Sequence, residues 1–94
     1  MAPRKVAEIV KALGSKGFEI EEGGRHIKCK LLVDGLPTRI LTVFSRGSRG
    51  EYNDFMLGKV SRQLGLQRKE FDDLVDCPLD KPGYLTLLRE RDKI

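Results

Sequence analysis

Histidine, cysteine and aromatic residues are scarce in this chain. Its 94 residues include one histidine, two cysteines, four phenylalanines, two tyrosines and no tryptophan. Cys29 and Cys77 lie far apart in the sequence and form neither a disulfide framework nor the ligand spacing of a metal site. We therefore expect a reducing, cytoplasmic location, no cofactor and no bound metal.

Long apolar runs are also absent. Residues 1–5 lead directly into an amphipathic stretch, so we expect neither a signal peptide nor a membrane span. The length suits one domain with a modest core, which we divide into residues 1–76 and a C-terminal extension, residues 77–94. The 18 Lys and Arg residues outnumber the 14 Asp and Glu residues, and the formal charge of +4 favours an anionic partner without requiring one.

The spacing of apolar residues predicts an α+β fold. Helical periodicity indicates one helix from Val6 to Leu13, ended by Gly14 or Gly17, and another near residues 55–64, closed by Gly65. Between them, strands are expected at residues 18–22, 26–33 and 38–44, with turns at residues 23–24 and 34–37. This order, helix, three strands, helix, predicts a three-stranded antiparallel sheet with helices on one face and the other face open to solvent.

The last third of the chain gives a weaker pattern. Residues 67–75 predict a short third helix, whereas residues 84–91 are ambiguous between helix and strand. Leu85, Leu87 and Leu88 could be buried against the domain, form the seam of a homodimer or receive a protein partner. Burial is the default interpretation.

The single histidine marks the candidate site. In the strand from residue 26, His26, Lys28 and Lys30 alternate with apolar residues and should share the open face of the sheet. An imidazole can exchange protons near neutral pH, and Arg25, Lys28 and Lys30 could hold a phosphate of RNA. The alternative is a solvated strand that carries an ordinary surface histidine and solubilising lysines.

A glycine-rich basic loop at residues 45–50 is a second candidate. Arg46 and Arg49 precede a predicted helix, which suits phosphate binding, although a solvated flexible loop fits the same residues. Ser48 and Glu51 have the spacing of a capping box. Tyr52 could stack on a base, but we favour the interpretation that it fixes the loop to the core.

Five short motifs follow one another over the first three quarters of the chain, at residues 6–13, 16–19, 24–27, 59–66 and 69–71. In their shared order and spacing they resemble the HicA-type (YcfA-like) family of small messenger-RNA interferase toxins from prokaryotic toxin–antitoxin pairs. Each motif is short, so the inference depends on that order and spacing.

The resemblance implies a fold similar to a double-stranded-RNA-binding domain and a metal-independent endoribonuclease. It places the catalytic histidine at His26 and implies messenger RNA as substrate and a HicB-like antitoxin protein as partner. Family members usually have Gly-Ser-His where this chain has Gly24, Arg25 and His26, and they differ in the loop after the third strand. A non-catalytic RNA-binding module and a protein-interaction domain therefore stand as alternatives.

Overall fold

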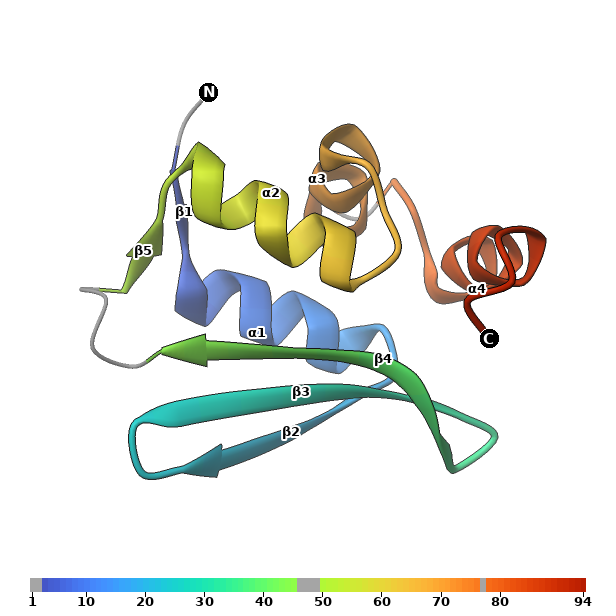
Figure 1. The fold of residues 1–94 in the computed structure, drawn as a ribbon, viewed down its shortest axis with the longest axis horizontal. Coiled ribbons are helices and arrows are strands. Elements are labelled where there is room, and N and C mark those ends of the chain that lie inside the picture. Colours follow the sequence, from blue (N-terminus) through green and yellow to red (C-terminus); the bar gives the residue numbers. More distant parts are fainter. Residues whose placement is uncertain (1–2, 46–49, 77) are drawn as a thin grey trace.

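The computed structural model describes residues 3–45, 50–76 and 78–94, and it has the predicted α+β fold (Figure 1). In chain order its elements are β1 (Arg4–Lys5), α1 (Val6–Ser15), β2 (Phe18–Gly23), β3 (His26–Val33), β4 (Leu36–Ser45), β5 (Glu51–Tyr52), α2 (Asp54–Gln63), α3 (Arg68–Asp76) and α4 (Lys81–Glu90). The main sheet is antiparallel, with β3 between β2 and β4. Strand β1 pairs separately with β5.

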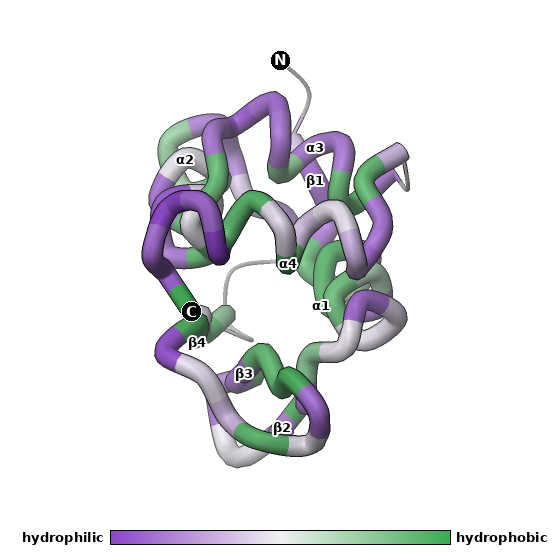
Figure 2. Tube along the Cα trace, turned by 90° about the vertical axis from the view of Figure 1, so that its right-hand side faces the viewer, coloured by the Kyte–Doolittle hydropathy of each residue, from purple (hydrophilic) through white to green (hydrophobic). Residues whose placement is uncertain are grey.

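The helices lie on one side of the sheet, as predicted, and leave its other face open (Figure 2). Alternation along β3 buries Cys29 and Leu31 beneath the helices, and β4 buries Phe44 in the same way. Ile9 and Leu13 form the buried stripe of α1 opposite these strands. One hydrophobic core thus fixes which face of the sheet meets solvent.

Two tight turns connect the strands of the main sheet, and both differ from the predicted bounds. The register of β3 against β4 also shifts at an irregularity between Lys30 and Leu32. Gly23 pairs with His26, so the first turn consists of Gly24, with a φ of 58°, and Arg25. This arrangement is typical of a type II′ turn. The second turn is only Asp34 and Gly35, both with positive φ, as in a type I′ turn. Because primed turns match the twist of paired strands, β4 begins at residue 36 rather than at residue 38.

The sequence did not predict the ribbon of β1 and β5. Each strand has two residues, too few to show alternation, and Lys5 lies opposite Glu51. Of the predicted capping box, Ser48 lies outside the described residues, and Glu51 belongs to β5 rather than to the first turn of α2, which begins at Asp54. Helix α2 is capped instead by Asn53, whose side-chain oxygen accepts a hydrogen bond from the Met56 N–H at 3.0 Å.

The ambiguous C-terminal segment is helix α4, and it packs against the rest of the domain. Tyr84 and Leu88 are fully buried, and the Tyr84 hydroxyl donates a hydrogen bond to the Leu64 carbonyl at 2.8 Å. Burial is therefore confirmed for Leu88, while Leu85 and Leu87 are half-buried against the same core. Within the described ranges, no helix combines the length and the apolar character needed to cross a bilayer.

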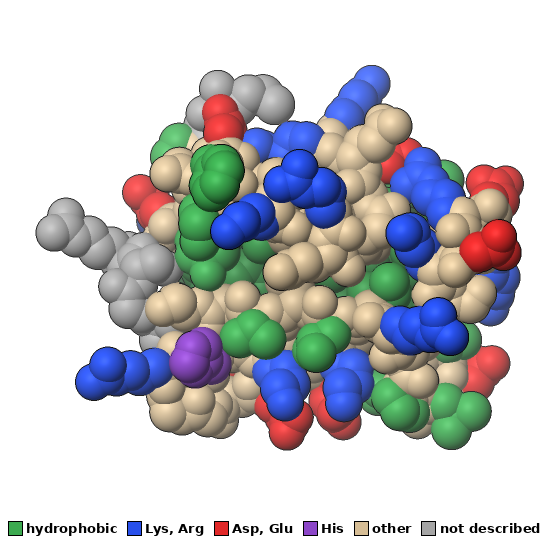
Figure 3. Space-filling model, in the orientation of Figure 1, with side chains coloured by type: hydrophobic (Ala, Val, Ile, Leu, Met, Phe, Trp, Pro, Cys, Tyr) green, Lys and Arg blue, Asp and Glu red, His purple; other side chains and the backbone are tan. Residues whose placement is uncertain are grey.

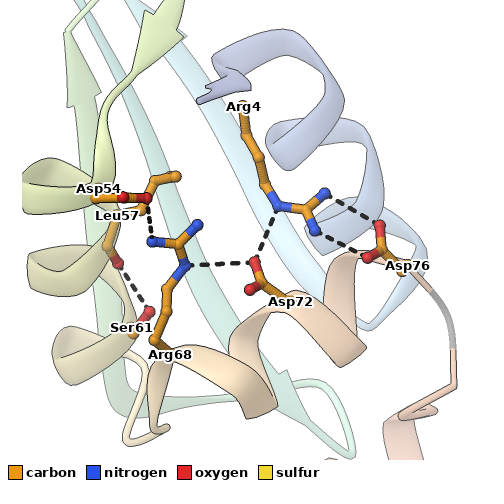
Figure 4. Close-up of polar contacts among 7 residues, drawn as sticks. All are labelled: Arg4, Asp54, Leu57, Ser61, Arg68, Asp72 and Asp76. Atoms are coloured by element: carbon orange, nitrogen blue, oxygen red, sulfur yellow. Dashed lines mark hydrogen bonds and ion pairs between the residues drawn. The ribbon is translucent and has the colours of Figure 1, made fainter. Parts of the chain in front are cut away.

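A chain of ion pairs holds α3 against α2 and β1 (Figure 4). Arg4 donates two hydrogen bonds to Asp76, at 3.0 and 2.8 Å, and a third to Asp72 at 3.0 Å. Arg68 joins Asp72 to Asp54. Hydrogen bonding from Arg4 lowers the pKa of Asp76, and hydrogen bonding from Arg68 lowers the pKa of Asp54. These two arginines are thus committed to structural contacts rather than to a ligand.

Candidate nucleic-acid interface

The predicted row of basic residues lies on the open face of the sheet. His26 and Lys28 are exposed and Lys30 is half-buried, whereas the intervening Cys29 is buried. Figure 3 shows the histidine on the same face of the molecule as several basic side chains. The alternation expected from the sequence is therefore confirmed, and the imidazole is accessible to a ligand.

The neighbours of His26 explain why its ring is uncovered. Its partner on β2 is Gly23, which has no side chain to shield the imidazole from that direction. Together with Glu21, Glu22, Gly23 and Lys28, His26 lines a shallow pocket of about 260 Å³. Arg25 stands in the preceding turn and is exposed. A small anionic group could thus approach the imidazole from solvent without displacing protein.

A row of carboxylates beside the lysines was missed from the sequence. Glu21 lies directly opposite Lys28, and Glu19 lies opposite Lys30, on the same face of the sheet. In the described part of the chain, neither lysine forms an ion pair with these carboxylates, so the opposite charges are neighbours without direct contact. Counting back from a two-residue turn would have located both glutamates. Their presence lowers the positive potential over β2.

A row of apolar side chains follows on β4. Leu41, opposite Lys30, is 38% exposed, and Val43, opposite Lys28, is 41% exposed. The open face consequently carries an acidic row on β2, a basic row on β3 and an apolar row on β4. Two exposed apolar side chains in one row are less common on a solvated strand than a single one.

The predicted basic loop, residues 45–50, is described only at its two ends. Arg46 and Arg49 fall outside the described residues. Tyr52 is buried, its ring packs on Phe44 with centroids 5.5 Å apart, and its hydroxyl accepts a hydrogen bond from the Ser45 N–H at 3.0 Å. The interpretation that Tyr52 fixes the loop to the core is confirmed, and the interpretation that it stacks on a base is wrong.

Neither the Cys29 thiol nor a metal site offers an alternative to His26 among the described residues. Burial raises the pKa of the Cys29 thiol to about 11, so this side chain stays protonated in the core. Among the residues that the structure describes, no three His, Cys, Asp or Glu side chains converge in a way that could hold a metal ion. His26 is the one histidine of the chain, and its imidazole is exposed on the open face.

No protein-family model, curated protein or solved structure matches this chain. A function must therefore be inferred from the geometry of the open sheet face and from the resemblance of the sequence motifs.

Proposed function

We propose that this protein binds RNA on the open face of its sheet and cleaves it, as a toxin-like endoribonuclease with His26 as the general base. One observation carries the proposal. The only histidine of the chain is exposed at the start of β3, in a shallow pocket shared with Lys28. The position also matches the histidine that the HicA-type resemblance marks as catalytic.

The reaction needs one proton acceptor at the attacking oxygen. A neutral His26 imidazole would take the proton of a ribose 2′-hydroxyl while that oxygen forms a bond to the adjacent phosphorus. The bond from phosphorus to the 5′-oxygen of the next nucleotide then breaks, and solvent supplies the proton of the leaving alkoxide. The products are a 2′,3′-cyclic phosphate and a free 5′-hydroxyl, with atoms and charge balanced.

The cations beside His26 would hold the reacting phosphate. Arg25 offers a planar fork of donors from the turn, and Lys28 offers a point charge next along the same face. Lys30 stands two residues further and could hold a flanking phosphate. General acid–base help typically contributes about 10²- to 10⁴-fold, so a single histidine supports a slow nuclease.

A non-catalytic RNA-binding module is the second candidate. It is favoured by Arg25, which stands where HicA-type members usually carry a serine before the catalytic histidine. Such a site would bind RNA and leave it intact, with an affinity lowered by the carboxylates of Glu19 and Glu21 opposite the lysines. If a HicB-like antitoxin regulates this chain, it would have to cover His26 or displace RNA from the open face, where Leu41 and Val43 are exposed.

The test is cleavage of labelled RNA, in chelator, by wild-type protein, His26→Ala and Lys28→Gln. We expect His26→Ala to lose cleavage by at least about 10²-fold while retaining RNA binding. We expect Lys28→Gln to weaken binding and cleavage together. Lys69→Gln, an exposed basic position on α3, is the matched control and should behave as wild type.

His26 is exposed, so His26→Ala should keep the far-ultraviolet circular dichroism and melting temperature of the wild type. Cleavage undiminished in this variant would refute the catalytic role. Salt-sensitive RNA binding without any cleavage by the wild type would favour the non-catalytic module.

A further inference from the structure

The outward side of α2 combines an aromatic ring with unpaired positive charges. Leu57 and Val60 point into the core, whereas Phe55 is 68% exposed and Lys59 and Arg62 are exposed on the other side. The Lys59 ammonium lies 5.2 Å from the centre of the Phe55 ring, within the range of a cation–π contact. We call Phe55, Lys59 and Arg62 the α2 face.

The charges of the α2 face are not neutralised by their neighbours. Asp54, the acidic residue of this helix, is hydrogen-bonded to Arg68 at 2.9 Å. Lys59 and Arg62 form no ion pair with any described residue. On the sheet, by contrast, the lysines of β3 face the glutamates of β2. The stronger attraction for an anion therefore lies on the α2 side of the basic row.

The α2 face and the open sheet face form one continuous surface around β4. Strand β4 is the edge of the main sheet, and α2 is joined to it by a hydrogen bond from the Thr42 hydroxyl to the Gln63 side chain. Figure 3 shows hydrophobic and basic side chains over α2 in the same view as the histidine and the basic row. Leu41 and Val43 lie between the two regions on the outer side of β4.

We propose that the α2 face is a binding site for single-stranded RNA. An unpaired base stacks on the Phe55 ring, Lys59 and Arg62 contact flanking phosphates, and the strand crosses β4 toward His26. The site requires a single strand because a duplex keeps the faces of its bases stacked inside, whereas an exposed ring can bind any unpaired base. The assignment rests on RNA being the ligand of the proposed function, but not on cleavage.

The experiment measures RNA affinity in the His26→Ala background, so that any cleavage does not disturb the equilibrium. The probes are a fluorescent single-stranded RNA of about 12 nucleotides, within the range that such proteins cover, and a blunt duplex of the same sequence. Phe55→Ala and Phe55→Leu should weaken single-strand binding by about 5- to 150-fold, the usual effect of removing one stacking ring. Phe55→Tyr should bind within about twofold of its parent, because it keeps the ring.

The positive charges are tested separately. The double variant Lys59→Gln, Arg62→Gln should reduce the slope of log affinity against log salt by about 1.4, as expected for two lost phosphate contacts on a single strand. Lys69→Gln should leave the slope unchanged. Because the altered side chains are exposed, melting temperatures of all variants should match that of their parent.

The outcomes distinguish a failure of this site from a failure of the proposed nuclease. Single-strand affinity unchanged in Phe55→Leu would overturn the α2 face as an RNA site. If wild-type protein also cleaves RNA, the nuclease would survive that result. Conversely, ring-dependent binding by a protein that never cleaves would support the α2 face and refute the nuclease. A parent protein that binds neither probe would overturn both.

Discussion

Truncation of Leu88 should be among the most destabilising changes in this domain, because α4 completes the core. Leu88 is fully buried, and one of its methyl groups would lie 2.8 Å from a Cβ placed on Gly65. The side chain thus packs directly on the backbone that ends α2. That backbone is held by hydrogen bonds from Tyr84 to Leu64 and from Arg91 to Gly65, so it cannot collapse into the space left by Leu88→Ala. We expect a loss of about 3–5 kcal/mol, the upper part of the range for leucine truncation.

Urea unfolding followed by circular dichroism measures this loss. Leu88→Ala should lower the midpoint of a single transition without changing its slope, because α4 unfolds together with the sheet. Thr86→Ser is the control: it lies on the exposed side of the same helix, keeps the hydroxyl that donates a hydrogen bond to the Pro82 carbonyl, and should change stability by less than about 0.5 kcal/mol. A loss below about 1 kcal/mol for Leu88→Ala, or a separate early transition for α4, would contradict the integral role of this helix.

Two further predictions concern charge. Because Arg4 lowers the pKa of Asp76 below its usual 3.8, their pair stabilises the fold above that pH and is lost as the pH falls through the lower, folded-state value. The free energy of unfolding should therefore fall less on acidification in Asp76→Asn than in the wild type, by under about 1 kcal/mol because the pair is so exposed. An equal fall in the two proteins would exclude this contribution. Glu21→Gln should tighten RNA binding a few-fold at low salt, because it removes the repulsion between the carboxylate and the phosphates. Two unit charges 4 Å apart in water interact with about 1 kcal/mol. Weaker binding in that variant would show that Glu21 assists the ligand.

The open face was predictable because alternation is a local property. A strand places successive side chains on opposite faces, so the order of residues 26–31 already separates the exposed His26 and Lys28 from the buried Cys29 and Leu31. The helical stripe of α1 was predictable for the same kind of reason. The glutamates opposite the lysines were not recognised, because their position depends on the register between two strands. That register follows from a turn of two residues, Gly24 and Arg25.

Phe55 shows the limit of local patterns at the candidate site. It sits among apolar residues at the start of a predicted helix, where burial is the usual outcome, yet it is 68% exposed. Its exposure depends on how α2 is rotated against the core, and Leu57 and Val60 determine that rotation. Tyr52 shows the opposite case, an aromatic residue next to a polar loop that is nevertheless buried, because Phe44 of β4 packs against its ring.

The sequence by itself determined the order of α1, the three strands of the main sheet, α2 and α3, and the face of β3 that carries His26, since these follow from periodicity within single elements. Only the tertiary structure decided that residues 81–90 form a helix packed on the core through Tyr84 and Leu88, and that the α2 face meets the open sheet face around β4. These features depend on contacts between residues far apart in the chain. Such contacts are selected by the packing of one shared core rather than by the local preferences of each segment.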